Sequence, residues 1–214
     1  GAPDPAVANE RIAADRKAAL DVLKPSKKDL EHGLELHAGS VVLDTYGFGP
    51  AAAVDNAVLA KLISSGASEQ EIGDAREDMM MTRFITDPAE RAEYEGAWNA
   101  ASVTAIVRNS GEEGSDPMRL MKRLARWVHV TDRLRERFPK AVRADEIVAA
   151  KKAGHHAITL TTNGVPLVQQ WHNTVDEMRY IRVFAELGVR MMHLTYNRRN
   201  PIGDGCGEAI DAGL

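Results

Sequence analysis

The chain has 214 residues, of which 44% are hydrophobic and 27% are charged, and its formal net charge is −4. The apolar content is too high and the net charge too low for a disordered chain, and the mild acidity argues against a nucleic-acid-binding face. The single cysteine, Cys206, excludes an internal disulfide framework and a cysteine-rich zinc site. No apolar run approaches the length of about 18 residues that a membrane span needs.

Helix-forming residues dominate the start of the chain. Residues 6–23 are rich in alanine and in charged helix formers and stop before Pro25, and a second, shorter helix is predicted over residues 27–37, closing at Gly39. We therefore expect an N-terminal helical extension over residues 1–39 and a separate domain over residues 40–214.

Four short apolar runs after residue 40 predict strands, with helical stretches between them. This alternation is typical of right-handed parallel crossovers in an α/β sheet. The predicted strands are 41–44, 102–108, 157–162 and 190–196, and the predicted helices are 54–63, 69–84, 88–98, 116–138, 144–152 and 174–187.

Side chains that carry chemistry in such folds lie where strands end and loops begin. The set at these ends is poor in groups for hydrolysis, because it holds one carboxylate and no histidine. Its members are Asp44, Tyr46 and Phe48 after the first strand, Arg108 and Asn109 after the second, Asn163 after the third, and Tyr196 and Asn197 after the fourth.

The histidines and the cysteine are expected to play structural or minor roles. His193 lies inside the predicted fourth strand, with its side chain on the face opposite to that of Tyr196, so a packed core histidine is the favoured interpretation. His172 follows the third strand and is a weak candidate for a binding site at the mouth of the fold, the end at which the carboxyl ends of the strands meet. Cys206 lies in a glycine-rich loop that supplies no neighbouring base, so an inert thiol is favoured.

Three segments carry motifs that resemble one family. Residues 184–197 read FAELGVRMMHLTYN, and they are followed by NPIGDG at 200–205 and DAGL at 211–214. They resemble the membrane (renal) dipeptidase family of the amidohydrolase superfamily, in which a helix ending in ELGVR leads into a strand reading LTHN. Residues 154–166 resemble the third strand of that family and residues 41–50 its first strand.

The resemblance implies a (β/α)8 TIM-type barrel that binds two zinc ions and hydrolyses dipeptides. In that family a His-x-Asp pair on strand one and a bridging Glu on strand three hold the metals, and a histidine on strand four polarises the scissile carbonyl. Carried onto this chain, the pair falls on Tyr46 and Phe48, the glutamate on Asn163 and the strand-four histidine on Tyr196. Phenylalanine and a neutral amide do not replace anionic oxygen ligands. We therefore predict a degenerate metal site, and no metal cofactor held by the part of the barrel that this chain supplies.

The resemblance also bears on partners. Four strands are half of eight, so we expect the chain to supply the N-terminal half of a barrel. The partner would be a C-terminal half-barrel, in the same polypeptide, as a cleaved fragment or as a second chain, and a homo-oligomer is an alternative. A small peptide-like ligand is expected, without nucleic acid or a membrane span. The compartment stays open, with a periplasmic or secreted location favoured over a cytoplasmic one because the chain starts at Gly1.

The leading hypothesis for function is a dipeptidase-like homologue that binds or acts on a dipeptide-like or amino-acid-derived ligand. Asn163 and Tyr196 occupy the catalytic positions of the family, and Tyr46, Phe48, Asn197 and Asp44 are the candidate ligand-binding residues. One alternative is an active zinc dipeptidase with a shifted metal site completed by the other half. Another is a non-catalytic subunit that pairs with a partner half-barrel. Whether the protein is an enzyme therefore stays open.

Overall fold

The computed structural model describes residues 9–113, 116–167, 173–200 and 202–209, so His172 and residues 211–214 lie outside the described residues. The chain forms two compact units, Gly1–Val42 with Gly49–Thr104, and Leu43–Phe48 with Ala105–Leu214. Among the described helices, none combines the length and the hydrophobicity that a membrane crossing requires. The expected division at residue 39 stays a prediction.

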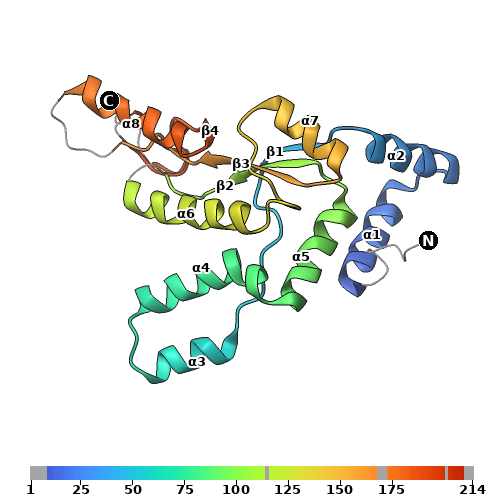
Figure 1. Ribbon diagram of the computed structural model, residues 1–214, viewed down its shortest axis with the longest axis horizontal. Helices are drawn as coiled ribbons and strands as arrows, with labels where there is room; N and C mark the ends of the chain where they lie inside the picture. The colour runs from blue at the N-terminus through green and yellow to red at the C-terminus, as the bar shows by residue number, and fades with distance from the viewer. Residues whose placement is uncertain (1–8, 114–115, 168–172, 201, 210–214) are drawn as a thin grey trace. The chain divides into compact units, whose positions relative to one another are not determined.

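In its described part, the first unit is built from helices. Ser68 accepts a hydrogen bond from the backbone of Glu71, whose carboxylate in turn accepts from the backbone of Ser68, and this capping box starts α4 as the sequence predicts. Phe84 is fully buried and stacks on Tyr94 of the next helix, with ring centroids 3.8 Å apart. The helices are α1 (Glu10–Leu23), α2 (Lys27–Gly39), α3 (Asn56–Ser64), α4 (Glu69–Thr86) and α5 (Pro88–Ala101), coloured blue to green in Figure 1.

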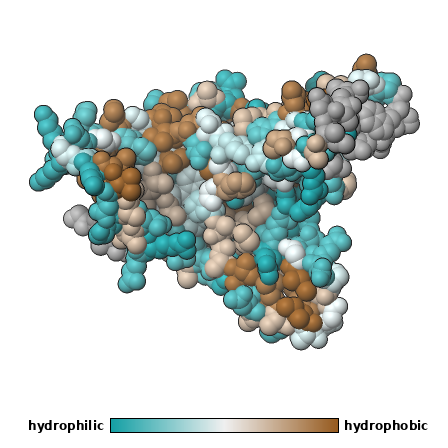
Figure 2. Space-filling view, turned by 180° about the vertical axis from the view of Figure 1, so that it is seen from behind, coloured by the Kyte–Doolittle hydropathy of each residue, from teal (hydrophilic) through white to brown (hydrophobic). Residues whose placement is uncertain are grey.

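Some apolar side chains of this unit face solvent. Val58 and Ile63 on α3 are exposed, and Figure 2 shows apolar surface over the hairpin of α3 and α4. Helix α4 nevertheless buries Met81, Phe84 and Ile85, and Phe84 packs against α5.

The second unit carries a sheet of four parallel strands in the order β1-β2-β3-β4. This confirms the expected α/β fold class, because strands that pair in sequence order with helices between them are the arrangement found in a TIM-type barrel. The elements are β1 (Leu43–Gly47), β2 (Ala105–Asn109), α6 (Pro117–Arg133), α7 (Ala144–Ala153), β3 (Ala157–Thr162), α8 (Thr174–Glu186) and β4 (Val189–Met192).

Helices α6 and α7 cover opposite faces of the strands (Figure 1). Successive side chains of a strand point to opposite faces. The guanidinium of Arg108 on β2 lies 4.3 Å from the centroid of the Trp127 ring on α6, whereas Ala105 on the same strand belongs to a buried cluster with Ala150 of α7. Asn109 is an even number of residues from Ala105, so it ends the strand on the face away from α6.

Two predicted elements extend too far. Helix α6 ends at Arg133, although Leu134 and Phe138 are still buried as the predicted stripe required. The predicted fourth strand is wrong beyond Met192. After His193 the backbone is bonded elsewhere, because Asn200 donates its side-chain amide to the carbonyl oxygen of Leu194 at 2.8 Å.

Candidate functional site

A single hydroxyl joins three strands at their carboxyl ends. The Tyr46 hydroxyl on β1 donates to Oδ1 of Asn163, directly after β3, at 2.5 Å. It accepts from Nδ2 of Asn109, the last residue of β2, at 2.8 Å. Asn109 and Asn163 are both buried, so these bonds form a fixed polar floor at the edge of the sheet where barrels of this class place their chemistry.

The pairing of the strands explains why these side chains meet. Asn109 pairs with Thr161, and Asn163 lies two residues further on; because the Tyr46 hydroxyl bonds to both asparagines, they lie on the same side of the sheet. In β1 the register shifts between Asp44 and Gly47. Such an irregularity re-aims the side chains near it, and here it turns Tyr46 toward Asn109 and Asn163.

Asp44 and Gly47 stabilise this irregular segment. Oδ1 of Asp44 accepts from the backbone N–H of Tyr46 at 3.1 Å. A Cβ on Gly47 would lie 2.5 Å from Oδ2 of Asp44 and 2.6 Å from Cδ1 of Ile106, so only glycine fits. The carboxylate of Asp44 is therefore engaged with its own strand.

The phenol of Tyr46 is held in its neutral form. Burial, and then the neighbouring hydroxyl of Tyr196, raise the pKa of Tyr46 from 10.0 to about 12, against the smaller opposing effect of the hydrogen bonds to Asn163 and Asn109. Tyr46 thus carries its proton at physiological pH and acts as a hydrogen-bond donor and acceptor. It does not supply a phenolate.

Aromatic rings surround this hydroxyl. The ring of His193 lies 5.0 Å from that of Tyr46 and 5.7 Å from that of Tyr196, between centroids. The prediction that the side chain of His193 points away from Tyr196 is wrong. The strand ends at Met192, and the strict alternation of sides ends with it. His193 stays beside the sheet through a bond from its N–H to the carbonyl oxygen of Thr162 at 3.2 Å.

The structure brings together Tyr46, Asn163 and Tyr196 from the predicted set. Phe48 lies at the rim, with its ring 6.4 Å from that of Tyr46 and 63% of its surface exposed. Asn197 instead bonds to the carboxylate of Glu113, donating from Nδ2 to Oε1 at 3.2 Å. The ligand-binding and catalytic roles of these residues stay predictions.

Sequence reasoning missed three members of this region. Asn109 was placed at a strand end but not selected, and His193 was assigned to the core. Glu113, in the loop after β2, also accepts from the backbone N–H of Arg198 at 2.8 Å, which ties that loop to the loop after β4. The sequence did offer one indication for Glu113: it lies four residues beyond the end of β2, at the same edge of the sheet as Asn109.

Gly205 lets the loop after β4 fold back on itself. A Cβ at this position would lie 2.4 Å from the backbone nitrogen of Arg198 and from the carbonyl carbon of Asn197. The same loop holds Tyr196, whose carbonyl oxygen accepts from the N–H of Cys206 at 2.7 Å. We expect Gly205→Ala to displace the loop and to lower the free energy of unfolding by about 1–3 kcal/mol.

The measurement is urea unfolding of Gly205→Ala beside Gly73→Ala. Gly73 lies within α4, and nothing stands within 4 Å of a Cβ built there, so this control should be neutral or more stable by up to about 1 kcal/mol. Equal midpoints for the two variants would show that the loop is not closely packed at Gly205.

Comparison with known proteins identifies the fold of the chain. No protein-family model matches the sequence, and no curated protein matches it. Among solved structures, an amidohydrolase from Pseudomonas aeruginosa matches at a TM-score of 0.50 and 20% identity, over 85% of this chain and 41% of that chain. The chain has an amidohydrolase-like fold. Dipeptidase AC, a metallopeptidase of family M19, matches at a TM-score of 0.45 and 12% identity, over 74% of this chain and 43% of that chain. The chain thus spans less than half the length of either protein.

The groups that Tyr46 brings together, Asn109 and Asn163, are neutral and supply no anionic ligand for a divalent cation. In the described ranges, no three or more His, Cys, Asp or Glu side chains are grouped so that they could hold a metal ion. The carboxamide oxygens are already engaged, Oδ1 of Asn163 by the Tyr46 hydroxyl and Oδ1 of Asn109 by the N–H of Gly111. Two adjacent cations need anionic ligands, and the neutral groups found here bring no charge.

Proposed function

We propose that the chain is part of a dipeptidase-like amidohydrolase barrel whose mouth binds a dipeptide-like or amino-acid-derived ligand without a binuclear metal site. The observation that carries the proposal is the neutral hydroxyl of Tyr46, held between Asn109 and Asn163 across three strands. In the family that the sequence resembles, the equivalents of Tyr46 and Asn163 are metal ligands. Here the two side chains bond to each other.

The proposed chemistry is binding and orientation. Tyr46 fixes the carboxamide of Asn163 with its oxygen toward the phenol, so that its N–H groups are the atoms left to donate. These donors suit a carbonyl or carboxylate oxygen of a peptide-like ligand. His193 adds an imidazole at the same place, whose ring nitrogens can donate or accept a hydrogen bond.

The two edge strands of the sheet support the proposal that this chain pairs with a partner. β1 and β4 each pair with one strand only in the four-stranded sheet of the described residues. Edges of this kind are normally paired, covered or otherwise protected. We propose that further strands, forming a C-terminal half-barrel, pair with them and complete the wall of the binding site.

Metal analysis and ligand binding test the proposal together. We expect the purified protein to contain far less than one zinc ion per chain, and its affinity for an alanyl-alanine probe to be the same with and without a chelator. Tyr46→Phe keeps the ring but removes the hydroxyl that orients the carboxamide of Asn163, and it should weaken binding of the probe about 5–10-fold, the effect of losing one hydrogen bond from Asn163 to the ligand.

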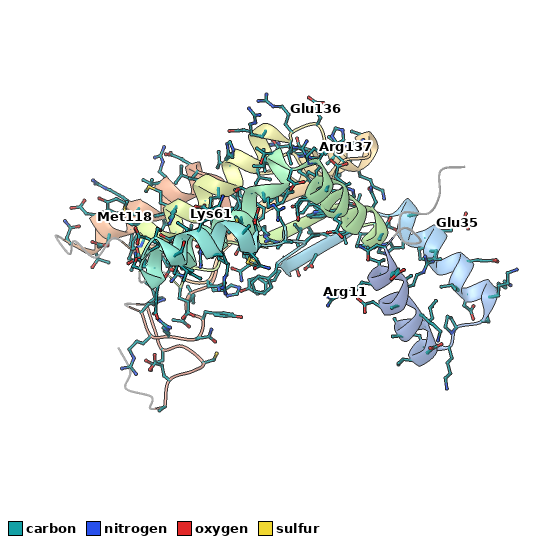
Figure 3. All side chains as sticks on the ribbon, turned by 90° about the horizontal axis from the view of Figure 1, so that it is seen from below. Arg11, Glu35, Lys61, Met118, Glu136 and Arg137 are labelled. Atoms are coloured by element: carbon teal, nitrogen blue, oxygen red, sulfur yellow. The ribbon has the colours of Figure 1, made fainter. Side chains whose placement is uncertain are left out.

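Glu136→Gln is the matched control, because Glu136 is exposed beyond the end of α6 (Figure 3) and precedes the segment that leads into β3, at the other end of the strands. About two zinc ions per chain, with probe hydrolysis abolished by the chelator, would instead establish the active metallodipeptidase. A metal-free protein that binds no probe would favour the non-catalytic subunit.

A further inference from the structure

The mouth of the second unit gathers four aromatic or imidazole rings. Tyr46 contacts all three of the others, at centroid distances of 5.0 Å to His193, 6.4 Å to Tyr196 and 6.4 Å to Phe48. Phe48 meets Tyr46 edge-on, at 64° between the ring planes, and is 63% exposed. An exposed phenylalanine in this geometry leaves the face of its ring available for another ring.

The hydrogen-bonding groups beside these rings differ in whether they are already used within the protein. Oδ1 of Asn163 and Oδ1 of Asn109 already accept hydrogen bonds within the protein, from Tyr46 and Gly111. Nδ2 of Asn163 has no such partner among the described residues, so it is a donor that a ligand can use. A ligand that binds to it must bring the acceptor.

The nearby carboxylates are directed elsewhere. Asp44 accepts from the backbone of Tyr46. Glu113 accepts through one oxygen from the side chain of Asn197 and through the other from the backbone of Arg198. Aromatic faces attract cations as well as rings, so a cation is the competing class of ligand.

We propose that the ligand is an amino-acid derivative with a flat aromatic side chain and a carbonyl or carboxylate oxygen. The aromatic ring stacks against Phe48 and the neighbouring rings, and the oxygen accepts from Nδ2 of Asn163. This inference rests on the proposed function for the position of the site, and it adds which class of ligand the site selects.

A matched pair of probes tests the selection for flatness. N-acetyl-phenylalanine amide and N-acetyl-cyclohexylalanine amide carry the same acceptors and differ in whether the ring is aromatic. We expect the phenylalanine probe to bind to the intact protein about 3–10-fold more tightly by calorimetry, the range that favourable ring pairs give beyond burial of area. Equal affinities, or tighter binding of the cyclohexyl probe, would overturn the proposal.

Two kinds of variant separate stacking from hydrogen bonding. Phe48→Leu should bring the ratio of the two affinities close to one, whereas Phe48→Tyr should preserve it; Phe48 is exposed, so both variants are expected to fold. Tyr46→Phe should weaken both probes equally and leave the ratio unchanged. If both probes bind equally well to the wild type, the ligand class is wrong and the proposed function stands. If neither binds, the proposed function fails as well.

A cationic probe tests whether the rings bind a cation instead. Phenyltrimethylammonium has an aromatic ring and a cation but no acceptor. We expect it to bind at least tenfold more weakly than N-acetyl-phenylalanine amide. Tighter binding of the cationic probe would show that the rings form a site for cations and would overturn the proposal.

Discussion

Trp127→Ala is expected to lower the free energy of unfolding by about 3–5 kcal/mol. Trp127 is 1% exposed on α6, among the buried side chains of Leu120, Leu124 and Val130, and its ring lies over the guanidinium of Arg108 on β2. The substitution creates a large cavity between helix and sheet and removes the aromatic face from a buried cation. A loss of this size is a large fraction of the 5–15 kcal/mol that stabilises a typical protein.

Urea unfolding followed by far-ultraviolet circular dichroism measures this effect, because fluorescence would itself change with the loss of a tryptophan. Trp127→Phe is the matched control: it retains an aromatic face over Arg108 and should lose clearly less stability than the alanine variant. A loss below about 1 kcal/mol for Trp127→Ala, at an unchanged denaturant dependence, would mean that α6 does not anchor the sheet.

The sequence was most informative where packing leaves little choice. Residues 157–162 were predicted as a strand, and β3 occupies those residues, because a β-branched run between a glycine and a turn is buried on both faces. Helix α5 was predicted from Pro88, and Asp87 caps it in the structure. Local signals of this kind depend on neighbouring residues, so they can be read without the fold.

The candidate site was harder to predict because it depends on where a strand stops. Residues 190–196, RMMHLTY, predict a strand as far as Tyr196, so periodicity placed His193 and Tyr196 on opposite faces. In the structure β4 ends at Met192, and the two rings lie 5.7 Å apart. The loop that captures the backbone after Met192 lies further along the chain, and periodicity carries no information about it. Asn109 was overlooked for a different reason: its role follows from the register shift in β1, which aims Tyr46 at it.

Restoring the family's ligands should create a zinc site at the carboxyl ends of the strands. The resemblance places metal ligands at the positions of Tyr46, Phe48 and Asn163, and the Tyr46 hydroxyl lies 2.5 Å from Oδ1 of Asn163, so the ends of at least two of these side chains converge. We expect the triple variant Tyr46→His, Phe48→Asp, Asn163→Glu to bind zinc with a Kd of about 1 μM or tighter, because it supplies one imidazole and two carboxylates.

The decisive control is the same triple variant with Asn163→Gln in place of Asn163→Glu. The two variants differ in one charge and have nearly the same shape, so a bridging carboxylate predicts a loss of zinc affinity of at least tenfold in the glutamine form. Calorimetric titration with zinc measures both affinities, and circular dichroism compares both folds with the wild type. If both variants fold and neither binds zinc more tightly than the wild type, the mouth is not a degenerate metal site. The hydrogen bonds around Tyr46 would then have no connection to the ligand positions of the dipeptidase family.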